Sequence, residues 1–470
     1  MLAVVLVSLS LAGCSHVSGA SPHEQRVATS DTLRFGRFGP VVLYRHRGDP
    51  SRVVLLVSGD GGWNLGVVGM ARDIAGMDAL VVGIDIRRYL TGLARSHERC
   101  SYPAADFEAL SQWLQRRLNF PRYIPPILMG YSSGATLVYA TLVQAPPGTF
   151  AGAISLGFCP DLSVKRTFCG GSELASSPGL RGRGIRFAPG GHLAAPWIVL
   201  QGAADSTCGL AQTAAFVRRT PGAKVVVLPS VGHGFGVPAR WFPQLRDALT
   251  RLDRASLSTL STPAPAVRDL PLVELPAAGG SRTLAVVVSG DGGWASLDRQ
   301  IGETLSKEGV SVVGINSLKY FWRARTPDGA AADLTRVLRH YMPAWGASRI
   351  LLVGYSRGSD VLPFMASRLP ADLRDKVRLV ALLGFSHRAG FELHLTDFFG
   401  GGGRGSPTVP EIRKLRGMHI LCVYGSEETD SACRDLSPDL ANGMSLPGGH
   451  HFNGAYGEIA RRILREAGNT

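Results

Sequence analysis

Two serines stand in the local sequence that nucleophilic catalysis favours. The segments Ile127–Gly134 (ILMGYSSG) and Leu351–Asp360 (LLVGYSRGSD) each carry an apolar run into Gly-Tyr-Ser-x-Gly. A buried strand, a tight turn and a helix would place Ser132 or Ser356 at the tip of the turn, and the flanking glycines leave room for it. One such pentapeptide can arise by chance in a chain with 58 glycines, so the repetition is what favours catalysis.

A serine hydroxyl is a weak nucleophile, and it needs a histidine to take its proton and an acid to orient that histidine. Both follow each serine in the order Ser, acid, His. In the first half, Asp205 and His233 come after successive apolar runs. In the second half, His450 holds the matching place and is preferred to His451, because the neighbouring glycine and phenylalanine then align.

The acid of the second half has two candidates. Aligning Asp205-Ser-Thr-Cys with Asp430-Ser-Ala-Cys selects Asp430, whereas counting three residues from the preceding glycine selects Glu428. The sequence leaves both open. An isolated aspartate or histidine is usually structural, but the ordered set occurs twice, and this favours catalysis.

The hexapeptide Ser-Gly-Asp-Gly-Gly-Trp stands at 58–63 and again at 289–294. It follows an early strand from which folds of this kind donate one oxyanion amide, and the residue after the nucleophile donates the other. The candidate oxyanion residues are therefore Asp60, Ser133, Asp291 and Arg357. Helix capping is the alternative for the two aspartates, and we expect Trp63 and Trp294 to be packing residues.

The elements that position these residues repeat with them, so the halves are tandem copies of one domain. Strand-like and helix-like runs alternate in each copy, which predicts an α/β fold with a mostly parallel sheet and helices on both faces. Glycine- and arginine-rich stretches at 159–196 and 386–416 are expected to be irregular covering loops. The predicted division is a signal and tether (1–31), a first domain (32–254), a linker (255–268) and a second domain (269–470).

Composition limits the function class. The 470 residues are 45% hydrophobic and 18% charged, which excludes a disordered chain and suits two packed cores. The formal net charge of +14 comes from dispersed arginines and favours an anionic membrane surface as partner. No nucleic-acid-binding signature accompanies this charge, so we expect no nucleic acid partner, and no motif calls for a cofactor.

The first residues of the chain have features of a targeting signal. Leu2–Leu11 is apolar but too short to span a bilayer, and it ends in Leu-Ala-Gly-Cys. This resembles a bacterial lipoprotein signal, in which Cys14 is lipidated. Ser15 after it then suggests the outer membrane, with the body of the protein in the periplasm. The run lacks the usual positive residues, which a start codon assigned too far downstream would explain.

Six further cysteines are an even number, so disulfides are expected in an exported protein. They are Cys100, Cys159, Cys169, Cys208, Cys422 and Cys433. Their connectivity stays open. No Cys-x-x-Cys pair is present, so no metal site is predicted.

These motifs, with Leu318–Trp322 (LKYFW), resemble the bacterial virulence protein VirJ/AcvB family of α/β-hydrolase-fold periplasmic proteins. The second copy is similar to the VirJ-type domain from end to end, and the two-copy arrangement is similar to AcvB. The resemblance implies two tandem α/β-hydrolase-like domains. It also implies hydrolysis of lysyl-phosphatidylglycerol, a membrane phospholipid, and a link to virulence and type IV secretion, with a secretion-system partner. It favours the second copy as the active one, although the first keeps Ser132, Asp205 and His233.

Two other functions stay open from the sequence: a general carboxylesterase or lipase, and a non-enzymatic periplasmic adaptor. Intact Ser, acid and His residues in both copies favour the enzyme, because a scaffold gains nothing by keeping them. Selectivity for a lysyl group would need acidic residues near the pocket mouth. Asp291, Glu392 and Asp397 are the candidates around Ser356.

Overall fold

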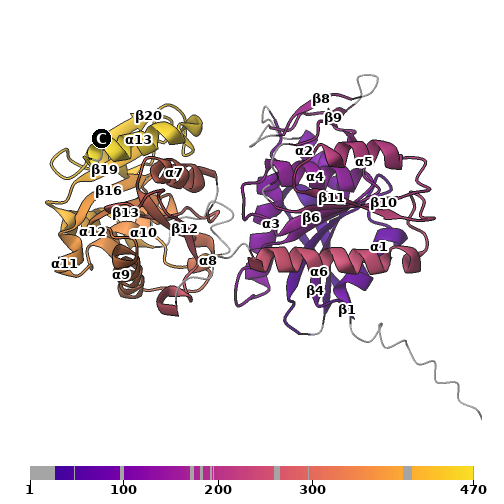
Figure 1. Cartoon of the computed structure of the whole chain (residues 1–470), viewed down its shortest axis with the longest axis horizontal. Coiled ribbons are helices and arrows are strands. Elements are labelled where there is room, and N and C mark those ends of the chain that lie inside the picture. The colour runs from indigo at the N-terminus through magenta and orange to yellow at the C-terminus, as the bar shows by residue number, and fades with distance from the viewer. Residues whose placement is uncertain are drawn as a thin grey trace, which may run out of the picture.

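The computed structural model describes residues 27–46, 48–95, 100–169, 174–179, 184–190, 193, 195–258, 265–294, 296–394 and 405–468. Within them the chain forms two α/β copies in succession, each built around its own sheet (Figure 1). Cys14 and Asp397 lie outside the described residues, as does the middle of the expected linker. Among the described residues, no helix combines the length and apolar character needed to cross a bilayer.

The first sheet has eight strands in the order β1-β2-β4-β3-β5-β6-β10-β11. β1 and β2 pair antiparallel, β2 is antiparallel to β4, and the remaining pairs are parallel. The strands are β1 (Val27–Phe35), β2 (Gly39–His46), β3 (Arg52–Val57), β4 (Ala79–Ile84), β5 (Ile127–Tyr131), β6 (Gly152–Leu156), β10 (Trp197–Gly202) and β11 (Ala223–Leu228).

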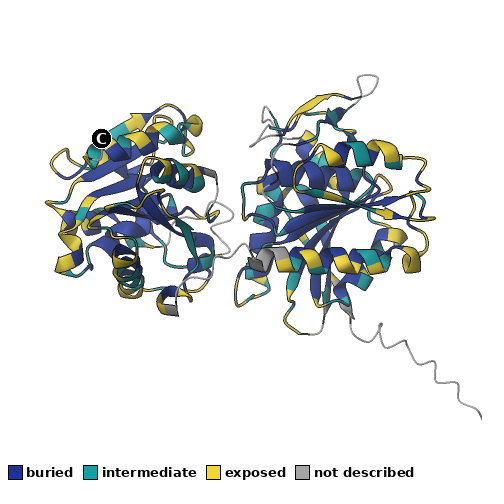
Figure 2. Ribbon diagram, viewed as in Figure 1, coloured by how far each residue is buried: buried dark blue, intermediate teal, exposed yellow. Residues whose placement is uncertain are grey.

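Helices cover both faces of this sheet, and alternate residues of β3 enter the two cores. Val53 and Leu55 pack with α2, α3, α4 and α5, while Val54 and Leu56 pack with α1 and α6. Both faces are therefore dry, which explains the unbroken apolar strands in the sequence (Figure 2). The helices are α1 (Leu65–Ala75), α2 (Ile86–Ala94), α3 (Pro103–Arg117), α4 (Ser133–Gln144), α5 (Leu210–Arg218) and α6 (Phe242–Ser258).

The second sheet has seven strands in the order β12-β14-β13-β15-β16-β19-β20. Only β12 runs antiparallel to its neighbour. The order equals that of the first sheet from β2 onward, so the copies share one topology. The strands are β12 (Leu272–Leu275), β13 (Thr283–Val288), β14 (Ser311–Ile315), β15 (Arg349–Tyr355), β16 (Val377–Leu383), β19 (Ile420–Gly425) and β20 (Asn442–Leu446).

Helices again flank this sheet on both sides. Helices α7 and α13 pack into a shared core on one face of the sheet, and α9, α10 and α12 contribute to the core on the other face. The helices are α7 (Ser296–Lys307), α8 (Ser317–Tyr320), α9 (Pro327–Ala344), α10 (Arg357–Ala366), α11 (Ala371–Arg374), α12 (Val409–Ile412) and α13 (Tyr456–Glu466). At the junction of the copies, α8 faces the end of α3 (Figure 1).

Short elements complete the two copies. The glycine- and arginine-rich stretches, expected to be irregular, hold small sheets of their own in the order β7-β9-β8 and β17-β18. These strands are β7 (Asp161–Leu162), β8 (Ser176–Pro178), β9 (Ile185–Phe187), β17 (Arg388–Ala389) and β18 (Ser406–Pro407). The 3₁₀ turns are η1 (Gly36–Phe38), η3 (Pro238–Arg240), η4 (Pro265–Val267), η6 (Arg413–Leu415), η7 (Ala432–Asp435) and η8 (Phe452–Gly454).

The ordered chain departs from the predicted division at two places. β1 begins at Val27, inside the expected tether, because this polar edge strand lacks the apolar pattern that marks the buried strands. α6 continues to Ser258, and Val267 is already buried in the core of the second copy. Most of the predicted linker therefore belongs to the folded units on either side.

Three disulfides join the six cysteines, which confirms the expectation that they are paired. Two lie in the first copy and one in the second. The pairs are Cys100–Cys169, Cys159–Cys208 and Cys422–Cys433.

Two candidate active sites

Ser132 occupies a strained turn between β5 and α4. Its φ of 55° and ψ of −122° lie where a residue with a side chain is held only at a cost of about 1–3 kcal/mol. A Cβ on Gly134 would lie 2.4 Å from the carbonyl oxygen of Ser58, and one on Gly130 would lie 2.1 Å from that of Gly134. Both glycines are therefore required, and the turn has the geometry of a nucleophile elbow.

Ser356 repeats this geometry between β15 and α10, with φ 52° and ψ −122°. A Cβ on Gly358 would lie 2.0 Å from the carbonyl oxygen of Val288, and one on Gly354 would lie 2.5 Å from that of Gly358. The strand, tight turn and helix predicted for both GYS motifs are thus present.

In the first copy, three side chains form a continuous hydrogen-bonded chain. Ser132 Oγ lies 2.9 Å from His233 Nε2, and His233 Nδ1 lies 2.9 Å from Asp205 Oδ2. With the proton on Nδ1, the histidine donates to the carboxylate and Nε2 accepts from the hydroxyl. This is the arrangement that general-base activation of a serine requires.

Further hydrogen bonds hold the carboxylate of Asp205 in place. The Asp205 side chain is fully buried, and its Oδ1 accepts from the amides of Thr207 (2.9 Å) and Cys208 (2.8 Å). Gln201 Nε2 donates to Oδ2 at 3.0 Å. These hydrogen bonds fix the carboxylate next to His233 Nδ1, where it can stabilise an imidazolium.

In the second copy, the acid bonded to the histidine is Glu428. Its Oε1 lies 2.5 Å from His450 Nδ1, and its Oε2 accepts from the Gly425 amide at 2.6 Å. Asp430 is exposed and does not contact this histidine, which corrects the alignment that selected it. Ser356 and His450 form no hydrogen bond with each other, and the His450 side chain is 38% exposed against 19% for His233.

The cysteines explain why the two alignments disagreed. Cys208 bonds to Cys159 after β6, whereas Cys433 bonds to Cys422 within β19, so the two cysteines are not equivalent. The equivalent positions are the third residues after Gly202 and Gly425, where both chains leave the sheet. That count gives Asp205 and Glu428, and the longer glutamate reaches the same ring nitrogen.

His451 has a different role from His450. Its Nδ1 lies 2.8 Å from the Tyr355 hydroxyl, away from the carboxylate of Glu428. Burial lowers the pKa of His451, and the neighbouring His450 lowers it further. His450 is therefore the ring that the geometry places in the site, as the glycine and phenylalanine alignment predicted.

Two supports of the histidines were missed in the sequence. The tyrosine of each GYS motif hydrogen-bonds the histidine carbonyl: Tyr131 to His233 at 3.0 Å, and Tyr355 to His450 at 3.3 Å. The glycine after β6 and its counterpart after β16 lie under the imidazole rings. A Cβ on Gly157 would lie 3.2 Å from His233, and one on Gly384 would lie 2.5 Å from His450. The repetition of GYS and of Gly-Phe was the available signal.

The repeated SGDGGW loop lies against each nucleophile. A Cβ on Gly59 would lie 3.1 Å from Ser132 Cβ, and one on Gly290 would lie 3.4 Å from Ser356 Cβ. Each loop closes as a turn, because the amide of its last glycine donates to the carbonyl of its first. The amides of Asp60 and Asp291 take no part in that turn bond, and the first amide of each elbow helix has no partner within its helix.

Buried hydrogen bonds fix this loop. Ser58 Oγ accepts from the Ile86 amide at 3.2 Å, and Ser289 Oγ accepts from the Ser317 amide at 2.9 Å. The tryptophan rings lie over strand glycines, since a Cβ at Gly83 would meet Trp63 at 2.1 Å. Trp294 covers Gly314 in the same way. Both tryptophans are packing residues, as predicted.

The two sites differ in charge at the residue after the nucleophile. In the second copy, Arg357 is nearly buried and its Nε forms an ion pair with Asp291. In the first copy, Ser133 holds the same place and offers no charge to Asp60. Among the described residues, the exposed Asp60 carboxylate has no hydrogen bond or ion pair. Within the described ranges, the SGDGGW loop of the first copy therefore carries an unpaired aspartate, whereas the aspartate of the second loop is paired with Arg357.

One group near the first site has metal-ligand chemistry. Ligand atoms of Asp205, Cys208 and His233 lie within 4.8 Å of one another. The sulfur of Cys208 is committed to the disulfide with Cys159, and the other two side chains hydrogen-bond each other. The arrangement thus fits a catalytic dyad better than a metal centre.

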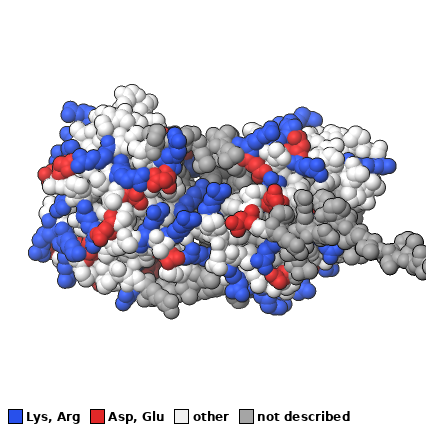
Figure 3. Space-filling model, turned by 90° about the horizontal axis from the view of Figure 1, so that it is seen from below, with Lys and Arg blue, Asp and Glu red and all other residues white. Residues whose placement is uncertain are grey.

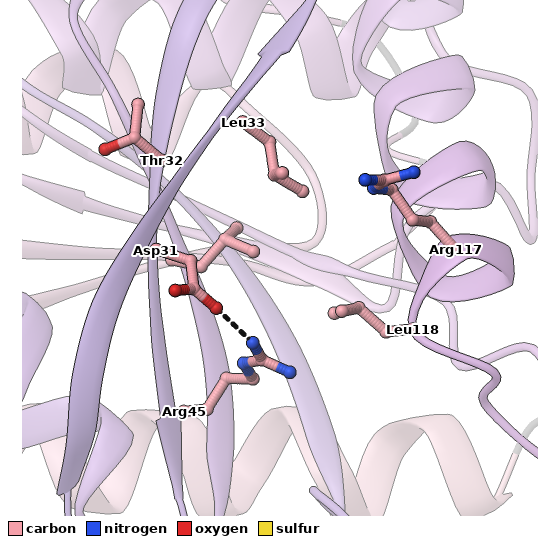
Figure 4. A pocket seen from close by; sticks show the side chains of 7 residues that line it. Asp31, Thr32, Leu33, Arg45, Arg117 and Leu118 are labelled. Atoms are coloured by element: carbon pink, nitrogen blue, oxygen red, sulfur yellow. Dashed lines mark hydrogen bonds and ion pairs between the residues drawn. The ribbon is translucent and has the colours of Figure 1, made fainter.

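A separate pocket of about 500 Å³ lies between the β1–β2 hairpin and the end of α3 (Figure 4). An ion pair between Asp31 and Arg45 crosses it, and Arg117 faces it from α3. No triad residue lines this pocket. It is therefore distinct from both serine sites.

A family model described as bacterial virulence protein (VirJ) matches residues 51–153 and 282–469, more than half of the chain. The chain belongs to the VirJ family. The matched segments include the first SGDGGW loop and elbow and nearly all of the second copy, whereas Asp205 and His233 of the first site lie outside them. No curated protein matches the sequence.

Several solved structures are similar to one half of this VirJ-family chain. A putative dienelactone hydrolase from Klebsiella pneumoniae is 15% identical and covers 49% of this chain and 98% of its own, with a TM-score of 0.34. A dienelactone hydrolase from Anabaena variabilis is 17% identical, covers 48% and 98%, and has a TM-score of 0.35. An α/β serine hydrolase without a lid from Xanthomonas campestris is 19% identical, covers 50% and 96%, and has a TM-score of 0.31.

Proposed function

We propose that this protein is a serine ester hydrolase that acts on an aminoacylated phospholipid, with lysyl-phosphatidylglycerol as the favoured substrate. The observation that carries the proposal is the hydrogen-bonded chain from Ser132 through His233 to Asp205, at a nucleophile elbow and beside the SGDGGW turn. Such a set has no packing function that would require its order and geometry.

In this mechanism, Ser132 Oγ attacks the ester carbonyl carbon while His233 Nε2 takes the hydroxyl proton. The amides of Ser133 and Asp60 stabilise the oxyanion of the tetrahedral intermediate, and Asp205 stabilises the imidazolium. The C–O bond of the ester then breaks, and His233 gives its proton to the leaving lipid oxygen, which departs as a hydroxyl. Water attacks the acyl-serine by the same route and releases the free amino acid.

The second centre is built for the same steps, with Glu428 in place of Asp205 and Arg357 in place of Ser133. Ser356 and His450 must come within hydrogen-bond distance of each other before the proton can be transferred. Catalytic hydrogen bonds often tighten only when substrate binds. We therefore propose activity at both centres, with the first assembled already in the free protein.

Charge supports a cationic ester on an anionic membrane. Most of the net charge of +14 lies in the first copy, where residues 32–254 hold 25 Lys and Arg against 13 Asp and Glu, and Figure 3 shows Lys and Arg dispersed over the described part of one face. A lysyl ammonium needs a local carboxylate, and our candidate is Asp60, which stands in the loop that packs against Ser132. Of the acids first considered around Ser356, Asp291 is paired with Arg357 and Glu392 with Arg116. The proposal includes a periplasmic location and a lipid anchor at Cys14.

The test measures hydrolysis of lysyl-phosphatidylglycerol and of a neutral acyl ester by the full chain, Ser132→Ala, Ser356→Ala and the double variant. We expect the lipid ester to be preferred and the double variant to be inactive. Asp60→Asn should raise KM for the lysyl lipid and leave the neutral ester unchanged. A preference for the neutral ester would instead indicate a general carboxylesterase, and full activity in the double variant would exclude both serines.

A further inference from the structure

The second copy inserts a tryptophan into the surface of the first. Trp322, which follows α8, is 1% exposed, and its Nε1 donates to the Phe120 carbonyl oxygen at 2.8 Å. Its ring packs against Tyr123, with centroids 5.3 Å apart. These two residues form a buried cluster with Leu318 and Leu393, so the contact joins the copies through apolar packing as well as hydrogen bonds.

Arg116 at the end of α3 crosses the same junction. Its Nη1 donates to the Trp322 carbonyl oxygen at 2.7 Å, and its Nη2 forms an ion pair with Glu392 of the second copy. The guanidinium also lies over the Trp322 ring, 5.8 Å from its centroid. Both charged side chains are partly shielded from water, so this pair is stronger than an exposed one.

The segment that Arg116 holds is also bound from inside the second site. Arg357 Nη1 donates to the carbonyl oxygens of Gly390 (2.8 Å) and Glu392 (3.2 Å). The Nε of Arg357 pairs with Asp291 in the SGDGGW loop. Arg357 follows Ser356 directly, and its own amide is one of the two expected oxyanion donors. Glu392 is therefore fixed by the first copy on one side and by the oxyanion region on the other.

We propose that Arg116 is a positioning residue for the Ser356 site: through Glu392 it fixes Arg357, and thereby the amides of Arg357 and Asp291 that receive the oxyanion. The inference rests on the proposed function of the second centre. The first centre has no such dependence, because Ser133 stands where Arg357 does and its hydroxyl has no hydrogen-bond partner in the part of the chain that the structure describes. The full activity of the second copy thus requires the first as a structural partner.

The activity test uses the full chain in two backgrounds, Ser132→Ala and Ser356→Ala, so that each centre is measured alone. Arg116→Ala should lower kcat at the Ser356 centre ~10-fold, with KM within ~2-fold, because the oxyanion donors act in the transition state. The same substitution should leave the Ser132 centre unchanged. Arg117→Ala, on the same helix, is the matched control and should affect neither.

Reversal of the pair checks the contact itself. Arg116→Glu combined with Glu392→Arg should recover most of the kcat that either single change removes. Equal losses at both centres would indicate general destabilisation and overturn the inference, as would an unchanged kcat at Ser356.

Hydrogen exchange separates this inference from the proposed function. The amide of Leu393 donates to the Phe321 carbonyl oxygen at 3.0 Å, and the amide of Arg325 donates to the Phe391 carbonyl oxygen at 2.9 Å. Arg116→Ala should speed exchange in peptides covering 386–394 and 321–326. Unchanged exchange there would refute the link even if Ser356 proved inactive. If the Ser132→Ala protein hydrolysed no substrate while Arg116→Ala still made exchange faster, the second centre would be inactive as an enzyme but the link between Arg116 and this segment would stand.

Discussion

The hydroxyl of Ser132 lies 2.9 Å from His233 Nε2, whereas the corresponding pair in the second copy, Ser356 and His450, forms no hydrogen bond. Both serines share the same strained backbone, and both histidines contact a carboxylate. The copies therefore differ in the last contact of the triad. We expect the first centre to react without rearrangement and the second to close on its substrate.

The acid of the second centre is tested by paired substitutions in the Ser132→Ala background. Glu428→Gln should lower turnover by roughly 10⁴, because the glutamine cannot stabilise an imidazolium on His450. Asp430→Asn should leave the rate within about 2-fold, since that residue is exposed and outside the site. Steady-state kinetics of the two variants decide the assignment, and the reverse pattern would restore Asp430.

The disulfide between Cys159 and Cys208 holds the acid loop of the first centre. It closes 49 residues, and its loss should cost about 4 kcal/mol of unfolding free energy. Because the Cys208 amide donates to Asp205, Cys159→Ser with Cys208→Ser should also lower kcat at Ser132.

The control is Cys100→Ser with Cys169→Ser, which opens the other bridge of the same copy. We expect a comparable fall in melting temperature with kcat retained for the folded fraction. If both pairs of substitutions changed kcat equally, the specific role of the acid loop would be ruled out.

Asp360 gives the second copy a pH-dependent stability. Burial raises the pKa of Asp360 well above its ordinary 3.8, and Asp291 adds to this, although the Ser386 amide opposes it. The folded protein therefore binds this proton more tightly than the unfolded chain does. The free energy of unfolding consequently falls as pH rises from about 4 toward the folded-state pKa.

Asp360→Asn should remove this loss. The asparagine oxygen can still accept from the Ser386 amide, which lies 2.7 Å from Oδ1 in the native protein. Thermal melts should show a gain in Tm at pH 8 that shrinks toward zero at pH 4. A variant less stable than the native protein at pH 8 would mean that Asp360 is stabilising in its charged form.

Sequence predicted most of the fold and the plan of both sites, because the constraints there are local. A buried parallel strand is an unbroken apolar run, and the elbow admits only glycine beside the serine, so Gly130, Gly134, Gly354 and Gly358 mark the sites directly. The order Ser, acid, His follows from the sequence of strands that carry them.

The remaining features depend on contacts between distant residues. Glu428 and Asp430 both follow the same strand, and only the path of the chain decides which reaches His450. Trp322 was visible as part of a motif, but nothing in its local sequence shows that it packs on Tyr123 of the other copy. The pairing of Glu392 with Arg116 likewise joins positions far apart in the chain.

Salt should lower the rate of hydrolysis at membrane surfaces. Attraction between a protein of charge +14 and anionic lipid is screened over a Debye length of ~10 Å at 0.1 M salt. Rates on lysyl-phosphatidylglycerol in vesicles rich in phosphatidylglycerol should therefore exceed those in zwitterionic vesicles and fall as salt rises. Equal rates on both kinds of vesicle, unchanged by salt, would contradict the electrostatic attraction to the membrane but not the assignment of the catalytic residues.

The central claim is that both serines are nucleophiles of a hydrolase. Its most direct test is labelling of the full chain with a fluorophosphonate, followed by peptide mapping and intact mass. We predict labelling at Ser132 and at Ser356, with Ser132 reacting faster because its hydrogen bond to His233 is already formed. Single serine-to-alanine variants should each lose one site. A protein that takes up no label at either serine while fully folded would contradict the account.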